Sequence, residues 1–71
     1  MFTLGMKDHE SHEYHIIFHD KDFHKVFAEL KSICENWISY YGVDVERLNG
    51  EYVMNWGMDG KTYFQIGFEH E

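Results

Sequence analysis

A chain of 71 residues with one Cys and no Pro predicts a single domain, residues 1–71, and excludes both a disulfide framework and a cysteine-based zinc site as its support. Thirteen Asp and Glu against six Lys and Arg give a net charge of −7. This charge argues against direct binding to nucleic acid or to an anionic membrane, and it favours a basic protein partner.

The residues before the longest helical pattern predict two strands joined by a polar loop. Residues 1–6 are apolar and predict a short strand that ends at Gly5, and residues 7–13 predict a loop. From residue 13 to residue 19 the side chains alternate, which is typical of a half-buried strand. The set expected to face the core is Tyr14, Ile16 and Phe18. The set expected to face outward is Glu13, His15, Ile17 and His19.

The longest periodic stretch predicts a helix from Asp22 to Tyr41. Asp22 precedes the first apolar residue as an N-cap, and Gly42 follows the last one as a C-cap. Because Cys34 falls on the apolar face, we expect it to be a small buried side chain and not a nucleophile. The apolar residues recur at steps of three and four, the spacing of one helix face: Phe23, Val26, Phe27, Leu30, Ile33, Cys34, Trp37, Ile38 and Tyr41.

The outer side of this helix is predicted to neutralise its own charges. Lys25 and Glu29, and likewise Lys31 and Glu35, are four residues apart and are expected to form ion pairs. These acids are therefore poor candidates for contacts with a partner.

Three strands are predicted after the helix. Residues 43–46 predict a short strand, and Asn49-Gly50 is a strong signal for a hairpin turn. Residues 51–56 and 61–69 predict two more strands, with a tight turn at Asp59-Gly60 between them. The side chains expected to face the helix are Tyr52, Met54, Trp56, Thr62, Phe64, Ile66 and Phe68. One long helix on one face of a small, mostly antiparallel sheet is an α+β fold, β(β)αβββ.

The uncovered face of this sheet is predicted to be rich in carboxylates, with Lys61 the only base that alternation places clearly there. Such a face suits a Lys/Arg-rich surface, whose usual ligand is DNA. An ordinary solvated face is the alternative interpretation. The predicted partner-binding residues are Glu13, Asp44, Glu46, Glu51, Asp59, Tyr63, Glu69 and Glu71.

The histidines near the N-terminus support a second hypothesis. In a helix, His12, His15 and His19 would share a face and suit zinc or nickel. Because residues 13–19 predict a strand, only His15 and His19 are expected on one face, so these three are weak metal candidates and no cofactor is predicted. A metal-binding or metal-sensing module is one alternative function, and a small oligomeric interaction subunit, for example a homodimer, is another.

No nucleophile or phosphate-binding motif is found, so the chain is not expected to be an enzyme. Residues 1–7 lack the basic lead and apolar core of a signal peptide, and no apolar run is long enough to cross a bilayer. A cytoplasmic location is therefore expected.

Over its whole length the chain resembles the small acidic inhibitors that bacteriophages make early in infection. The shared features are a single domain, strong negative charge, abundant aromatic residues, one Cys and no catalytic motif. That group includes inhibitors of uracil-DNA glycosylase, restriction enzymes, CRISPR effectors and the nucleoid protein HU, and the chain is most similar to the HU inhibitors. The resemblance carries over no individual residue. It implies a DNA mimic that occupies the basic DNA-binding surface of a host protein.

Overall fold

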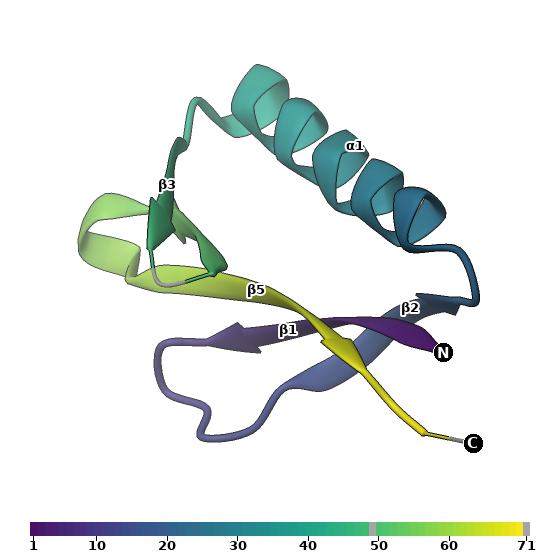
Figure 1. Ribbon diagram of the computed structural model, residues 1–71. Helices are drawn as coiled ribbons and strands as arrows, with labels where there is room; N and C mark the ends of the chain where they lie inside the picture. The colour runs from purple at the N-terminus through teal and green to yellow at the C-terminus, as the bar shows by residue number, and fades with distance from the viewer. Residues whose placement is uncertain (49, 71) are drawn as a thin grey trace.

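The computed structural model describes residues 1–48 and 50–70, except for the side chains of Leu48 and Asp59. Within these residues the elements are β1 (Phe2–Asp8), β2 (His15–Asp20), α1 (Phe23–Tyr41), β3 (Asp44–Leu48), β4 (Glu51–Asn55) and β5 (Lys61–Phe68), with a 3-10 turn, Gly57–Asp59, before β5. The strands form one antiparallel sheet in the order β2-β1-β5-β4-β3. The helix lies across one face of it (Figure 1). The predicted α+β fold is thus confirmed.

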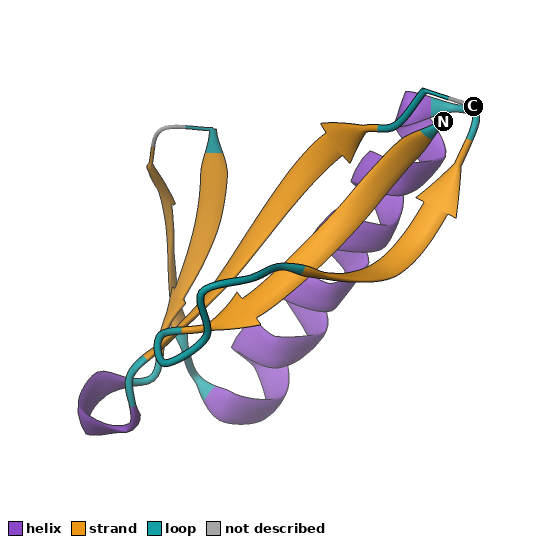
Figure 2. Ribbon diagram, turned by 90° about the horizontal axis from the view of Figure 1, so that it is seen from below, coloured by secondary structure: helices purple, strands orange, loops and turns teal. Residues whose placement is uncertain are grey.

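The helix side is the face of the sheet against which α1 packs, and the open side is the other face. Figure 2 looks at the molecule from below and shows the strands in front, the helix behind them, and the connection between β1 and β2 passing in front of the strands.

The ends of α1 follow from the residues that flank it. Asp22 has an extended backbone, and its Oδ1 accepts a hydrogen bond of 2.9 Å from the backbone N–H of His24. Gly42 adopts a left-handed φ of 63°, and its N–H donates to the carbonyl oxygen of Ile38 at 3.0 Å. Both predicted caps are confirmed. The regular helix begins at Phe23 because Asp22 is the cap itself.

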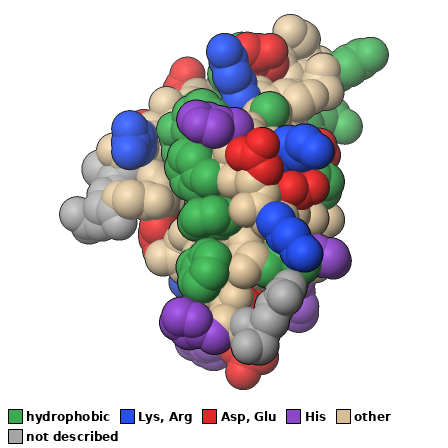
Figure 3. Space-filling model, turned by 45° about the vertical axis from the view of Figure 1, so that its right-hand side comes forward, with side chains coloured by type: hydrophobic (Ala, Val, Ile, Leu, Met, Phe, Trp, Pro, Cys, Tyr) green, Lys and Arg blue, Asp and Glu red, His purple; other side chains and the backbone are tan. Residues whose placement is uncertain are grey.

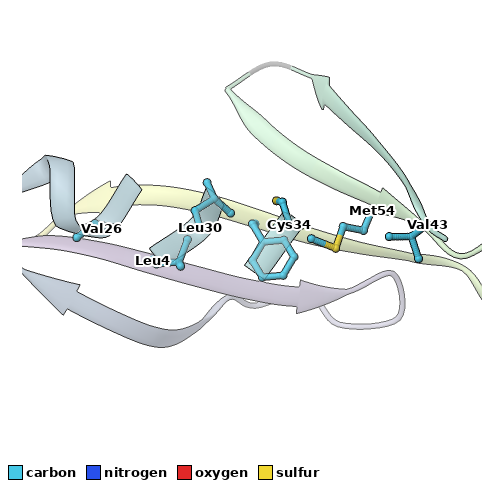
Figure 4. Close-up of a cluster of buried hydrophobic side chains, with 7 residues drawn as sticks. Leu4, Val26, Leu30, Cys34, Val43 and Met54 are labelled. Atoms are coloured by element: carbon cyan, nitrogen blue, oxygen red, sulfur yellow. The ribbon is translucent and has the colours of Figure 1, made fainter. Parts of the chain in front are cut away.

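The core fills the space between α1 and the helix side of the sheet. Its helix residues, Val26, Leu30 and Cys34, are spaced by four, so they stack along one line of α1. The buried position predicted for Cys34 is confirmed, with 8% of its surface exposed. Figure 4 shows the side chains of Val26, Leu30 and Cys34 directed toward those of the sheet. The buried apolar cluster consists of Leu4, Val26, Leu30, Cys34, Val43, Met54 and Phe64.

Some strand limits differ from the prediction. Strand β1 was expected to end at Gly5, but it continues to Asp8 because Lys7 and Asp8 pair with β5. Strand β2 begins at His15, two residues later than expected. The predicted hairpin residue Asn49 lies outside the described residues, and the strands on either side of it, β3 and β4, pair in antiparallel fashion.

A β-bulge in β2 overturns part of the predicted alternation. Phe18 pairs with Leu4, but the next pair along is Ile16 with Gly5, so Ile17 is the extra residue. Phe18 faces the helix side as expected. Ile16, expected to face the core, shares the open side with Gly5 and is 49% exposed. The extra residue shifts the period by one, and every position before it changes sides.

Within the described part of the chain, α1 lacks the long apolar run that a membrane-spanning helix requires.

Candidate functional site

The pairing register shows which side chains share the open side. Residues directly opposite one another on antiparallel strands project to the same side of the sheet. One row across the sheet contains Glu46, Val53, Tyr63 and Lys7. A second row contains Glu51, Gln65, Gly5 and Ile16. A third contains Asp44, Asn55 and Lys61.

Two of the predicted partner-binding acids lie together at one edge of this side, and a third lies on the next strand. Asp44 and Glu46 are exposed and lie two residues apart on the edge strand β3, so their Cα atoms are separated by about 7 Å. Glu51 is half-buried on the neighbouring strand β4. Tyr63, also predicted, lies in the same row as Glu46 but two strands away.

The other predicted residues are spread over the molecule or lie outside the description. Glu13 is exposed in the β1–β2 connection. Glu69 follows β5, where its backbone N–H donates to the carbonyl oxygen of Met1 at 2.8 Å. It is therefore at the far end of β5 from Lys61, which lies in the row of Asp44. Glu71 and the side chain of Asp59 are outside the described part.

A second base, which the sequence interpretation missed, lies near the centre of the open side. The Nζ of Lys7 is 5.2 Å from the centroid of the Tyr14 ring and 5.1 Å from that of Tyr63, which are cation–π distances. Lys7 was assigned to a loop because β1 was expected to end at Gly5. Its alternation within the longer strand would have placed it with Lys61 on this side.

The Tyr14 side chain extends across the open side, over β1, and reaches β4. It was expected on the helix side, but a Cβ built on Gly5 would lie only 3.0 Å from the Tyr14 Cβ, so the side chain lies directly over β1. Its hydroxyl donates to Glu51 Oε1 on β4 at 2.7 Å. Partial burial, followed by the hydrogen bond to the Glu51 carboxylate, raises the pKa of Tyr14 far above its ordinary value.

The exposed carboxylates keep their charge largely unpaired. Among the described residues, the one contact between a carboxylate and a basic group is from His9 Nε2 to Glu10 Oε1, at 3.6 Å. The prediction of ion pairs on α1 is therefore wrong: neither Lys25 and Glu29 nor Lys31 and Glu35 are in contact. Long exposed side chains gain little from pairing in water, so this arrangement is physically reasonable.

The metal candidates His12, His15 and His19 are not brought together. His19 pairs with Thr3 on the open side, whereas His15 pairs with Met6 on the helix side, because the bulge at Ile17 lies between them. His12 is exposed in the preceding loop. Within the described residues, no group of three or more His, Cys, Asp or Glu side chains has the arrangement of a metal site.

No protein-family model, curated protein or solved structure matches the chain.

Proposed function

We propose that this protein is an acidic decoy: it binds the basic DNA-binding surface of a host protein and displaces the DNA. An HU-like nucleoid protein in the cytoplasm of the host cell is the leading target, as the resemblance to acidic phage inhibitors implies. The observation that supports the proposal is the exposed acidic edge of β3, whose Asp44 and Glu46 have no ion pair with a Lys or Arg among the described residues.

The structure favours one part of the open side for this contact. Lys7 and Lys61 lie on β1 and β5, where they would repel a basic partner. Asp44 and Glu46 lie on β3, at the edge of the sheet. A partner's Lys and Arg side chains therefore approach the β3 edge, and the net charge of −7 attracts them from a distance.

A pair of charge-matched variants tests the proposal. One carries Asp44→Asn and Glu46→Gln, and the other carries Glu29→Gln and Glu35→Gln on the helix. Each removes two negative charges, so the two share the same net charge and differ only in where the charge is lost. Displacement of a fluorescent DNA duplex from purified HU is measured by anisotropy, from about 50 to 200 mM salt.

We expect the wild-type chain to displace the DNA and to lose potency as salt rises. The β3 variant should be about tenfold weaker, since two exposed contacts of about 0.7 kcal/mol each sum to roughly that factor. The helix variant should lose less than threefold, which is about 0.6 kcal/mol. Equal losses in the two variants, or no displacement by the wild-type chain at low salt, would contradict the proposed contact with HU.

A further inference from the structure

A cavity opens on the helix side, away from the acidic edge. It has a volume of about 340 Å³ and lies between the first half of α1 and the strands β1, β3, β4 and β5. This volume is within the range of small-molecule sites, about 300–1,000 Å³. The side chains that matter for its chemistry are Phe2, Phe23, Phe27, Arg47, Tyr52 and Phe68.

Five aromatic rings form a connected chain around this cavity. The centroid of the Phe2 ring is 5.0 Å from that of Phe68 and 5.4 Å from that of Phe23. The Phe23 ring is 6.1 Å from the Phe27 ring, and the Phe27 ring is 6.5 Å from the Tyr52 ring. The wall is therefore continuous from the end of β5, across the helix, to β4.

Three of the five rings are exposed to solvent. Phe23 is 41% exposed, Phe27 is 38% exposed and Phe68 is 54% exposed. Exposed apolar side chains that gather in one place mark binding sites. Figure 3 shows a band of hydrophobic side chains along one face of the molecule, with charged groups on both sides of it. A molecule that fills the cavity would remove part of this apolar surface from water.

Arg47, the only Arg of the chain, stands at one end of the row of rings. It pairs with Tyr52 and so projects to the helix side, opposite to its neighbour Glu46. Its guanidinium carbon is 5.7 Å from the centroid of the Tyr52 ring. Arg47 has no ion pair with a carboxylate among the described residues, so its planar set of N–H donors is available to a bound anion.

We propose that this cavity binds a small aromatic carboxylate. The apolar body of the ligand lies against the rings of Phe23, Phe27 and Phe68, and its carboxylate accepts hydrogen bonds from Arg47. The positive charge of Arg47 in the cavity wall favours an anionic ligand, even though the chain as a whole is acidic. A second copy of the chain is disfavoured as the occupant, because it would bring together two molecules that each carry a net charge of −7.

Titration of the protein with 2-naphthoate, monitored by isothermal titration calorimetry, tests this site. The neutral analogue 2-naphthalenemethanol keeps the ring system and removes the charge. Arg47→Gln removes the cation at the cavity. Lys25→Gln, on the side of α1 away from the cavity, removes the same charge elsewhere and serves as the matched control.

We expect 2-naphthoate to bind the wild-type chain and the Lys25→Gln variant equally. Arg47→Gln should weaken its binding about tenfold or more, as expected for a lost hydrogen bond between charged groups. The neutral analogue should bind more weakly than 2-naphthoate, and Arg47→Gln should not change its affinity. Removal of the ligand's charge and removal of the Arg47 charge would then have non-additive effects on binding, as expected if the two groups are in contact.

Three results would overturn the inference. The first is no detectable binding of 2-naphthoate up to about 1 mM. The second is an equal loss of binding in the Arg47→Gln and Lys25→Gln variants. The third is sedimentation of a dimer that dissociates when Phe68 is replaced by Ser, because that dimer interface would cover the cavity. None of these results depends on binding to HU, since the cavity and the acidic edge lie on opposite sides of the sheet.

Discussion

The contact of Tyr14 with Glu51 links the β1–β2 connection to β4, and its removal gives a direct test of the structure. Tyr14→Phe deletes the hydroxyl that donates to Glu51 Oε1 at 2.7 Å. A hydrogen bond to a charged group contributes about 1.5–3 kcal/mol, but the half-buried Glu51 regains water when the hydroxyl is lost. We therefore expect the free energy of unfolding to fall by about 1 kcal/mol, which lowers Tm by about 4–8 °C in a domain of this size.

Burial of the Tyr14 hydroxyl, together with this hydrogen bond, makes stability depend on pH in one direction. The folded state raises the pKa of Tyr14 above its ordinary value of 10.0, so the folded state retains the phenol proton where the unfolded chain loses it. The stabilisation is complete below about pH 10 and is lost as pH rises toward the folded-state pKa. Above pH 10 the wild-type chain should therefore lose stability more steeply than the Tyr14→Phe variant.

Position 5 controls whether this contact forms. A Cβ there would lie 3.0 Å from the Tyr14 Cβ, so Gly5→Ala should displace the Tyr14 side chain and cost about 1–3 kcal/mol. Urea unfolding followed by circular dichroism gives each free energy. The double variant should lose less than the sum of the single losses, because both changes disrupt one contact. Tyr40→Phe, at a site 82% exposed, is the control for the loss of a hydroxyl. If Tyr14→Phe costs no more than Tyr40→Phe, the contact does not stabilise the fold.

Two further predictions concern the core. Leu30 is only 1% exposed at the centre of the core. Its replacement by Ala should lower the free energy of unfolding by about 2–5 kcal/mol. A chain of this length has only about 4–11 kcal/mol of stability in all, so urea unfolding should show a much lower midpoint. A loss below 1 kcal/mol would mean that α1 is not packed on the sheet at this residue. Burial, and secondarily the nearby Glu35 charge, raises the pKa of the Cys34 thiol, so at pH 8 iodoacetamide should modify the folded chain much more slowly than the chain in urea. Equal rates would place Cys34 outside the core.

The sequence determined the helix and the strands that follow it. The cap residues Asp22 and Gly42 lie next to the apolar period, so local interactions fix both ends of α1. In β4 and β5 the strict alternation correctly places buried residues such as Met54 and Phe64 on the helix side. Each of these signals acts between neighbours in the chain, and this is why they are readable without coordinates.

The composition of the open side was decided by tertiary structure. The bulge at Ile17 depends on how β2 pairs with β1, and it is what separates His15 from His19 and turns Ile16 outward. The position of Tyr14 over β1 requires Gly5, nine residues earlier, and Glu51 on a distant strand.

The acidic edge and the aromatic cavity also differ in how far the sequence alone predicts them. Alternation alone placed Asp44 and Glu46 on one side of β3, as the register has them. Arg47 lies one residue beyond the predicted strand, and only the register shows that it projects to the other side. That Arg47 stands at the end of a row of rings from β1, α1, β4 and β5 follows only from the packing of those elements. The physical reason is that the period of a strand fixes relative sides within that strand, whereas pairing register and packing fix which residues of different strands meet.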